Sequence, residues 1–340
     1  LSDYYFTSDK LEAYGNGNLL KGGLVYADRI TTVSRSYASE IRMPFYGEGL
    51  DGLLRARSKQ LSGIVNGIDY NVYNPKTDKD IAVNYSVEDA IKAKAANKTA
   101  LQKELGLEEN PDAFMLGIVS RLTDQKGLDL VECVLDQICA EDVQLVVLGT
   151  GEGKYQDMFT YYSRKYPERV SANIFYSEAL SHRIYASCDA FLMPSLFEPC
   201  GLSQLMSLRY GTLPIVRETG GLRDTVTPYN EVDGTGTGFS FTNYNAHEML
   251  AIIRYAKKTY FNDRKAWNEM VLRAMKQDFS WDASAREYEK LYDGLIEEEA
   301  RRKEAIRLQQ AREAAEAALK EAEKALELAK RAEEKAIRKF

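Results

Sequence analysis

The stretch "AFMLGIVSRLTDQKGLDLVECVLDQICAEDVQLVVL" (Ala113–Leu148) decides the fold of this chain. It begins and ends with apolar runs, Ala113–Val119 and Val143–Leu148, which are typical of strands buried on both faces. Between them, Leu128–Cys139 has the length and apolar spacing of an amphipathic helix. A strand, a helix and a second strand in this order predict two parallel strands joined by a helical crossover.

The same alternation continues further along the chain. Segments of helical length, such as Leu202–Arg209, separate more apolar runs at Val170–Phe175, Ala190–Met193, Leu213–Val216 and Gly238–Phe241. Continuous apolar strands that alternate with helices indicate a parallel sheet covered by helices on both faces. We therefore predict a doubly wound α/β domain over residues 111–295, with its ligands at the carboxyl ends of the strands.

The part of the chain before this domain has a different pattern. Residues 1–84 contain two short apolar runs, Arg29–Val33 and Ser62–Ile68, and so predict too few strands for a complete sheet of their own. Residues 85–110 include a stretch rich in Ala, Lys and Glu, which predicts a linking helix that ends at Gly106.

Residues 296–340 consist almost entirely of Ala, Glu, Lys, Arg and Leu. They include opposite charges four residues apart, such as Glu316 with Lys320 and Glu327 with Arg331, an order that stabilises an isolated helix. The large apolar residues do not keep the spacing of a heptad repeat. We predict a solvated single helix; a weak coiled coil or a helix that binds a partner is the alternative.

The composition limits the possible functions. A net charge of -6 on 340 residues gives no basic surface for nucleic acid or an acidic membrane. The histidines are His182 and His247, and none of the four cysteines belongs to a CxxC pair, so no tetrahedral zinc site is expected. No signal peptide is visible, and no apolar run reaches the roughly 18 residues of a membrane span, so a reduced, cytoplasmic setting is expected.

Four glycine-bearing loops are candidates for binding phosphate. Gly149–Lys154 follows a strand, but the spacing of its glycines and the Tyr155 after its lysine do not match a P-loop. Lys21–Gly23 and Gly234–Gly238 precede strands, so we interpret the first as a helix or turn and the second as a turn. Gly220–Gly221 follows a strand and opens a helix, where free N–H groups can bind an anion.

Arg121 and Lys126 form the most distinctive pair of charges. Arg121 comes at the end of a predicted strand, and Lys126 lies just before the next helix. A planar guanidinium, an ammonium and a helix N-terminus together suit a diphosphate. By spacing alone, two surface charges in a loop remain the alternative.

A second group of candidate residues lies in "MPSLFEPCGLSQLMSLRYG" (Met193–Gly211). Glu198 falls between a strand and a helix, where a carboxylate can accept hydrogen bonds from two sugar hydroxyls. Its alternative role is to cap the helix. Cys200 could instead be a nucleophile with His182 as its base, but no third orienting group is evident.

Four separated motifs together resemble the bacterial-type glycogen and starch synthases, and they occur in the order of that family. The resemblance covers about residues 5–295. The motifs are NGIDYNVYNP (Asn66–Pro75), SRLTDQKGLDL (Ser120–Leu130), YSEALSHRIYASCDAFLMPSLFEPCGLSQL (Tyr176–Leu205) and RYGTLPIVRETGGLRDTV (Arg209–Val226).

The resemblance implies an α/β fold of GT-B type. A doubly wound Rossmann-like C-terminal domain would be accompanied by a partial N-terminal Rossmann-like domain and by the charged helix. The resemblance also implies an enzyme that transfers glucose, with retention, from ADP-glucose to the non-reducing end of an α-1,4-glucan, without a metal or another cofactor. The alternatives are a GT-B transferase with another sugar nucleotide, or a non-enzymatic scaffold with the helix as a docking arm.

The resemblance further implies a role for each matching residue. Arg121 and Lys126 would hold the donor diphosphate and stabilise its departing charge. Glu198 would contact the transferred glucose. The other residues of the implied nucleotide-sugar site are Cys200 and Gly201 beside the glucose, Leu202 and Ser203 at the helix start, Tyr176 on the adenine, Thr219, Gly220 and Gly221 along the donor pocket, and Asn66 at the cleft.

The family's K-x-G-G-L loop and its N-terminal histidine segment do not occur in this sequence; Lys21–Leu24 lacks the intervening residue. We therefore expect this chain to start late in the first domain, to bind adenine nucleotide weakly and to make little or no glucan. Measuring the incorporation of glucose from ADP-glucose into glycogen tests this expectation, and robust incorporation by the 340-residue chain would contradict it.

Overall fold

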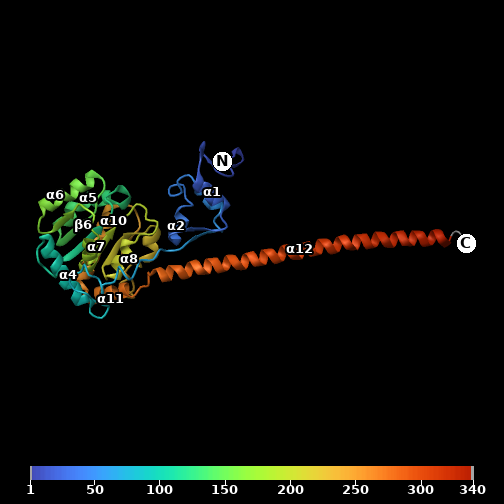
Figure 1. The fold of residues 1–340 in the computed structure, drawn as a ribbon. Helices are drawn as coiled ribbons and strands as arrows, with labels where there is room; N and C mark the ends of the chain where they lie inside the picture. Colours follow the sequence, from blue (N-terminus) through green and yellow to red (C-terminus); the bar gives the residue numbers. More distant parts are fainter. Residues whose placement is uncertain (1, 338–340) are drawn as a thin grey trace. The chain divides into compact units, whose positions relative to one another are not determined.

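The computed structural model describes residues 2–337. Leu1, the first residue of the predicted N-terminal region, and residues 338–340, the last of the predicted C-terminal helix, lie outside the described residues. The chain divides into two units, Leu1–Ser284 and Ala285–Phe340. The first unit contains the strands, and the second is helical (Figure 1).

A six-stranded sheet forms the centre of the first unit, in the strand order β10-β9-β8-β5-β6-β7. All of its neighbouring strands are parallel. The chain runs from β5 outward to β7 and then returns to the opposite side of β5, so the sheet is doubly wound, as predicted. The strands are β5 (Phe114–Val119), β6 (Val143–Leu148), β7 (Val170–Asn173), β8 (Ala190–Met193), β9 (Leu213–Arg217) and β10 (Phe239–Phe241).

Helices cover both faces of this sheet (Figure 1). α5 packs on α10, whereas α4, α7, α8 and α11 contact one another as a second group. The helices are α4 (Ala90–Leu105), α5 (Leu128–Ala140), α6 (Gly153–Lys165), α7 (Glu178–Ser187), α8 (Ser203–Arg209), α9 (Gly220–Thr225), α10 (Ala246–Asn262) and α11 (Arg264–Met275). All six residues of β6 are buried, which explains why five of them are apolar; the sixth, Gln144, is hydrogen-bonded to Gln102.

A buried ion pair ties α4 to this sheet. Lys98 Nζ lies 2.6 Å from a carboxylate oxygen of Asp189, and both side chains are almost fully buried. Burial by itself lowers the pKa of Lys98, but the Asp189 carboxylate outweighs this effect and raises it above its usual value. Lys98 Nζ also donates to Pro111 O, Ala113 O and the hydroxyl of Tyr260. The buried charge is therefore fully hydrogen-bonded, as a buried charge must be.

The N-terminal region contains a separate pair of parallel strands, β3 (Ile30–Thr32) and β4 (Leu61–Gly63). β4 is shorter than the predicted run Ser62–Ile68. Beyond Gly63 the chain leaves this pair, and Ile68 forms an isolated bridge with Ser280. The remaining elements are η1 (Asp3–Tyr5), β1 (Glu12–Ala13), β2 (Asn16–Gly17), α1 (Leu19–Tyr26), α2 (Arg35–Glu40) and α3 (Asp51–Ala56).

Lys21 lies inside α1, in agreement with its interpretation as part of a helix or turn. Asn18 caps this helix by accepting a hydrogen bond from the Lys21 N–H. The Lys21 ammonium donates to the carbonyl oxygens of Ser8 and Glu12, at 2.6 Å and 2.5 Å. Its charge is therefore used to hold the N-terminal region together.

Two predicted helix boundaries need correction. The linking helix, α4, begins at Ala90 and not at residue 85; it ends, as predicted, at Gly106, which has a φ of 69°. The C-terminal helix, α12 (Trp281–Ile337), begins well before Ile296. Ser280 marks this earlier start, because its Oγ accepts a hydrogen bond from the Ala283 N–H.

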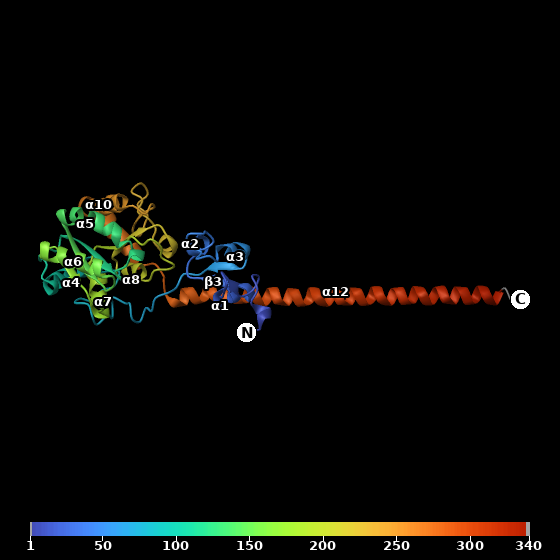
Figure 2. The same cartoon turned by 90° about the horizontal axis from the view of Figure 1, so that it is seen from above.

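Within the described residues, the second unit is one continuous helix, the main part of α12, as both views show (Figures 1 and 2). Ion pairs four residues apart support it, including Glu327–Arg331 at 2.6 Å and Glu299–Lys303 at 3.5 Å. Its large apolar side chains, such as Leu308 and Leu319, are exposed. Within residues 2–337, no helix combines the length and the apolar character needed to cross a membrane.

Candidate nucleotide-sugar site

Arg121 and Lys126 lie in the loop between β5 and α5, at the carboxyl end of β5. This loop includes a short 3-10 turn, η2 (Asp124–Lys126), and passes into α5 at Gly127. Gly127 has a φ of 71°, and a Cβ there would lie 2.1 Å from the carbonyl oxygen of Pro194. Glycine therefore allows the loop after β5 to pack directly on the loop after β8.

The structure brings two of the three predicted catalytic residues together. Lys126 Nζ lies 2.6 Å from Glu198 Oε2, and this carboxylate oxygen also accepts a 3.3 Å hydrogen bond from Ser195 Oγ. Glu198 is only 6% exposed, so its charge is paired inside the protein. Arg121, five residues before Lys126, is exposed, and its Nη2 donates to Gln125 Oε1 at 3.2 Å.

Backbone contacts hold the two loops in this arrangement. The N–H of Leu196 donates to the carbonyl oxygen of Gln125 at 2.9 Å. Arg217, at the end of β9, donates from Nη1 to the carbonyl oxygens of Ser195 and Leu196. Loops from three neighbouring strands thus fix the position of Glu198.

The glycines predicted to bind the donor form the support of this loop. The Gly221 N–H donates to the carbonyl oxygen of Glu198 at 3.0 Å. A Cβ on Gly220 would lie 1.9 Å from that same oxygen, and a Cβ on Gly221 would lie 1.9 Å from the carbonyl oxygen of Cys200. Gly201 has a φ of 70° and shapes the turn into α8. The start of α9 can pack against the Glu198 loop only because two of its residues lack side chains.

Glu40 is a residue at this site that sequence reasoning missed. The Gly220 N–H, predicted to be free for an anion, donates to Glu40 Oε1 at 2.8 Å. The hydroxyl of Thr219 donates to the same carboxylate at 3.2 Å. An acid of the N-terminal region therefore occupies the start of α9. No local pattern could reveal it, because Glu40 lies 180 positions away in the sequence.

The environment of Cys200 argues against its alternative role as a nucleophile. The side chain is 5% exposed, and burial raises the pKa of its thiol, although a hydrogen bond from the Asn66 backbone opposes that effect. A buried thiol with a raised pKa is a poor nucleophile. His182, its proposed base, is instead hydrogen-bonded to Asp78. The hydrogen bond between the Asn66 backbone and Cys200 places Asn66 beside the Glu198 loop.

The remaining predicted residues lie around the start of α8 and at the end of β7. Ser203 is the first residue of α8 and hydrogen-bonds with the Tyr185 hydroxyl, while Leu202 before it is exposed. Tyr176 is 85% exposed, so one face of its ring is available to a planar group. Among the described contacts, none joins Tyr176 to the Glu198 loop, so these residues do not form a single cluster.

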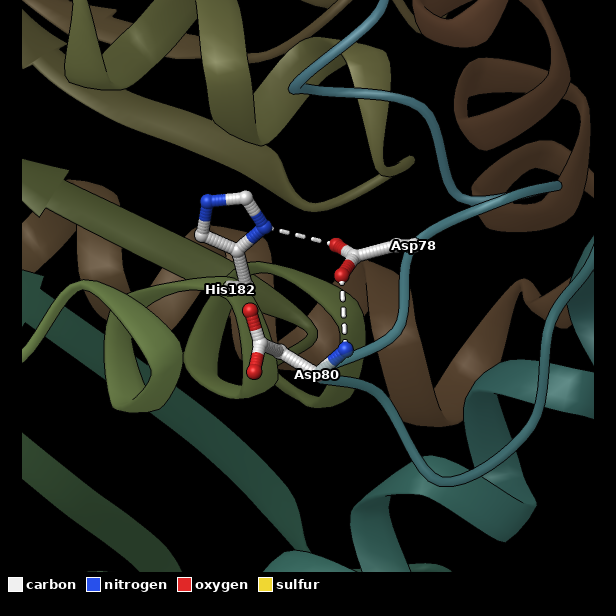
Figure 3. A group of neighbouring side chains, drawn as sticks. All are labelled: Asp78, Asp80 and His182. Atoms are coloured by element: carbon white, nitrogen blue, oxygen red, sulfur yellow. Dashed lines mark hydrogen bonds and ion pairs between the residues drawn. The ribbon is translucent and has the colours of Figure 1, made fainter.

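Among the residues that the structure describes, Asp78, Asp80 and His182 are near enough to hold a metal ion (Figure 3). Both carboxylate oxygens of Asp78, however, already have partners within the protein: His182 Nδ1 lies 2.7 Å from Oδ2, the Tyr210 hydroxyl donates to the same oxygen, and the Asp80 N–H donates to Oδ1. The second ring nitrogen of His182 faces away from Asp80 in Figure 3. These bonds explain the group as an anchor that fixes the chain segment before α4 onto α7.

Comparison with known protein families identifies the family of this chain. The model for the family described as "Glycosyl transferases group 1" matches residues 98–271, just over half of the chain, and the chain belongs to this family. The model described as "Starch synthase catalytic domain" matches residues 1–56. The predicted α/β fold of GT-B type is confirmed.

The close relatives are glycogen synthases. The chain is 70% identical to the glycogen synthase of Lachnospira eligens over 295 residues, and 64% identical to that of Lachnoclostridium phytofermentans. Each match covers 87% of this chain and 62% of the relative. The chain thus spans less than two thirds of the length of these relatives. The predicted resemblance to the glycogen and starch synthases is confirmed.

A solved structure supports the same relationship. The catalytic domain of starch synthase IV from Arabidopsis thaliana, bound to ADP and acarbose, matches with a TM-score of 0.80 at 34% sequence identity. The match covers 86% of this chain and 62% of that one.

The Asp78 network predicts a pH-dependent stability. Burial alone would raise the pKa of Asp78, but the bonds from His182, Tyr210 and the Asp80 N–H lower it below its ordinary value of 3.8. The contribution is therefore complete above about pH 4 and is lost as the pH falls through the lowered pKa. We expect Asp78→Asn to reduce the free energy of unfolding at pH 7 by about 1–3 kcal/mol, and by less near pH 3.

Urea unfolding at both pH values measures this difference. Asp80→Asn is the matched control, since it removes the same charge from an exposed neighbour. An equal loss in both variants, or a loss for Asp78→Asn that does not depend on pH, would contradict the role of the network.

Proposed function

We propose that this chain is part of a retaining glucosyltransferase that moves glucose from ADP-glucose to the non-reducing end of an α-1,4-glucan. The observation that carries the proposal is the paired Lys126 and Glu198 at the carboxyl ends of neighbouring parallel strands, in a chain 70% identical to a glycogen synthase. This edge of a doubly wound sheet is where such folds bind nucleotides.

Donor binding at this site is an exchange of partners. The side chains of Lys126 and Glu198 are 17% and 8% exposed, so leaving either charge unpaired would cost about 3–5 kcal/mol. The donor supplies both replacements: its diphosphate takes the Lys126 ammonium, and its glucose hydroxyls donate to the Glu198 carboxylate. The ion pair therefore satisfies both groups until the donor arrives.

The cations also act in the chemical step. As the bond from the anomeric carbon to the diphosphate breaks, negative charge grows on the leaving oxygen. Arg121 and Lys126 stabilise that charge, which is electrostatic catalysis directed at the leaving group. On the same face of the sugar, the leaving phosphate can accept the proton of the attacking hydroxyl. This route retains the anomeric configuration and assigns no general base, metal or other cofactor.

Tyr176, Ser203 and Asn66 complete the proposed donor site. The exposed ring of Tyr176 stacks on the adenine, Ser203 binds the ribose or phosphate region, and Asn66 borders the glucose subsite through its contact with Cys200. Leu202 offers its backbone at the start of α8. Thr219, Gly220 and Gly221 are buried, so their contribution to donor binding passes through the Glu198 loop that they support.

We place the reaction in the cytoplasm, which fits the four free cysteines, Cys133, Cys139, Cys188 and Cys200. A partner docked on α12 remains a prediction with no contact in its favour. A GT-B transferase with another sugar nucleotide remains the second candidate.

The choice of donor tests the proposal. We expect the chain to bind ADP-glucose about tenfold more tightly than UDP-glucose, because a purine stacks over a larger area of Tyr176 than a pyrimidine does. Titration calorimetry measures both affinities. Equal affinities, or tighter binding of UDP-glucose, would favour the second candidate.

The diphosphate assignment has its own test. Arg121→Ala should weaken ADP binding by roughly 1.5–3 kcal/mol, the free energy of a hydrogen bond to a charged group. Arg164→Ala, which removes an exposed arginine from α6, is the control. If calorimetry finds the same ADP affinity in Arg121→Ala and the unmodified chain, Arg121 does not bind the diphosphate.

A further inference from the structure

Helix α2 of the N-terminal region contacts the candidate site at both of its ends. Ser34 caps its start, and the Ser34 hydroxyl donates to the carbonyl oxygen of Pro199 at 2.6 Å. Glu40, its last residue, accepts from Gly220 and Thr219. A helix of six residues thus holds the Glu198 loop directly at Pro199 and indirectly through α9.

The contacts between α2 and α9 are specific. Ser36 donates twice to Asp224 on α9, from its backbone N–H at 2.9 Å and from its hydroxyl at 2.6 Å. The Ser34 side chain, which caps the start of α2, is fully buried. Because polar groups of both helices are matched in pairs, this contact fixes one register of α2 on α9.

A chain of hydrogen bonds leads from Glu40 to the proposed catalytic pair. The Glu40 carboxylate accepts the Gly220 N–H, and the next N–H, of Gly221, donates to the carbonyl oxygen of Glu198. The side chain of Glu198 then accepts from Lys126. Gly220 and Gly221 pack directly against the Glu198 loop, since a Cβ at either glycine would collide with a carbonyl oxygen of that loop.

We propose that Glu40 is a positioning residue, which orders the first turn of α9 and, through it, the Glu198 loop that receives the glucose of the donor. The donor site of one domain then depends on an acid supplied by the other. The inference rests on the proposed function for its effect on the donor, but the contact itself does not.

Amide hydrogen exchange measured by mass spectrometry tests the contact without any ligand. In Glu40→Ala, peptides covering residues 219–222 should exchange about tenfold faster, because the start of α9 loses a charge-assisted hydrogen bond. Glu40→Gln keeps an acceptor oxygen and should restore much of the protection. Asp28→Asn, which removes one exposed acid from the same region, is the control and should match the unmodified chain.

Calorimetry tests the effect on the donor. A displaced Glu198 loses contact with glucose but not with the nucleotide, so Glu40→Ala should weaken ADP-glucose several-fold more than ADP. A general loss of stability would weaken both alike. Unchanged exchange at residues 219–222, or an unchanged ratio of the two affinities, overturns the proposal.

Two further outcomes are informative. Tighter ADP binding by Glu40→Ala would overturn the proposal in another way, because it would show that Glu40 competes with the phosphate for the start of α9. If the unmodified chain binds neither nucleotide, the proposed function fails and the donor part of this inference fails with it. The exchange experiment then still decides whether Glu40 orders the loop.

Discussion

The parallel pairing of β5 with β8 is the constraint on which the site depends. It aligns the carboxyl ends of two strands that are far apart in sequence, and so brings Lys126 within 2.6 Å of Glu198. Between β5 and β8 the strand order of the doubly wound sheet reverses, and ligands of such sheets bind at the carboxyl ends of the strands at this switch point. An ion pair between side chains this poorly exposed is stable only where each partner is held in place, and the loops provide that support.

The support consists largely of main chain against main chain. Gly127 lets the first loop approach Pro194, and Gly220 and Gly221 let α9 approach the carbonyl oxygens of Glu198 and Cys200. Contacts at such distances exclude any side chain, so motifs rich in glycine at this edge reflect packing as much as ligand binding. This explains why the glycine pair that sequence reasoning assigned to the donor pocket is buried beneath the loop.

Local patterns in the sequence predicted the sheet because the central strands are buried on both faces and are therefore mostly apolar. They also placed Arg121, Lys126 and Glu198 at strand ends, where a ligand site was expected. They could not predict partners that only folding brings together. The pairing of Asp78 with His182 joins a linker to α7, and Glu40 contacts Gly220, which lies 180 positions further along the chain. The start of α12 was misplaced because Trp281–Ile296 lacks the Ala, Glu and Lys composition that marked the rest of the helix.

The contacts of α2 show why two distant segments of the first unit both matter to one site. Without the α2 contacts, α9 would present a free N–H at Gly220 and a serine-binding acid, Asp224, to water. With them, the N-terminal region completes the hydrogen bonding around the Glu198 loop, while Asn66 contacts Cys200 from the segment that follows β4. Under the proposed function, the glucose subsite would form where the N-terminal region meets the Glu198 loop. The geometry of that subsite and the contact between the two regions would then depend on the same few residues.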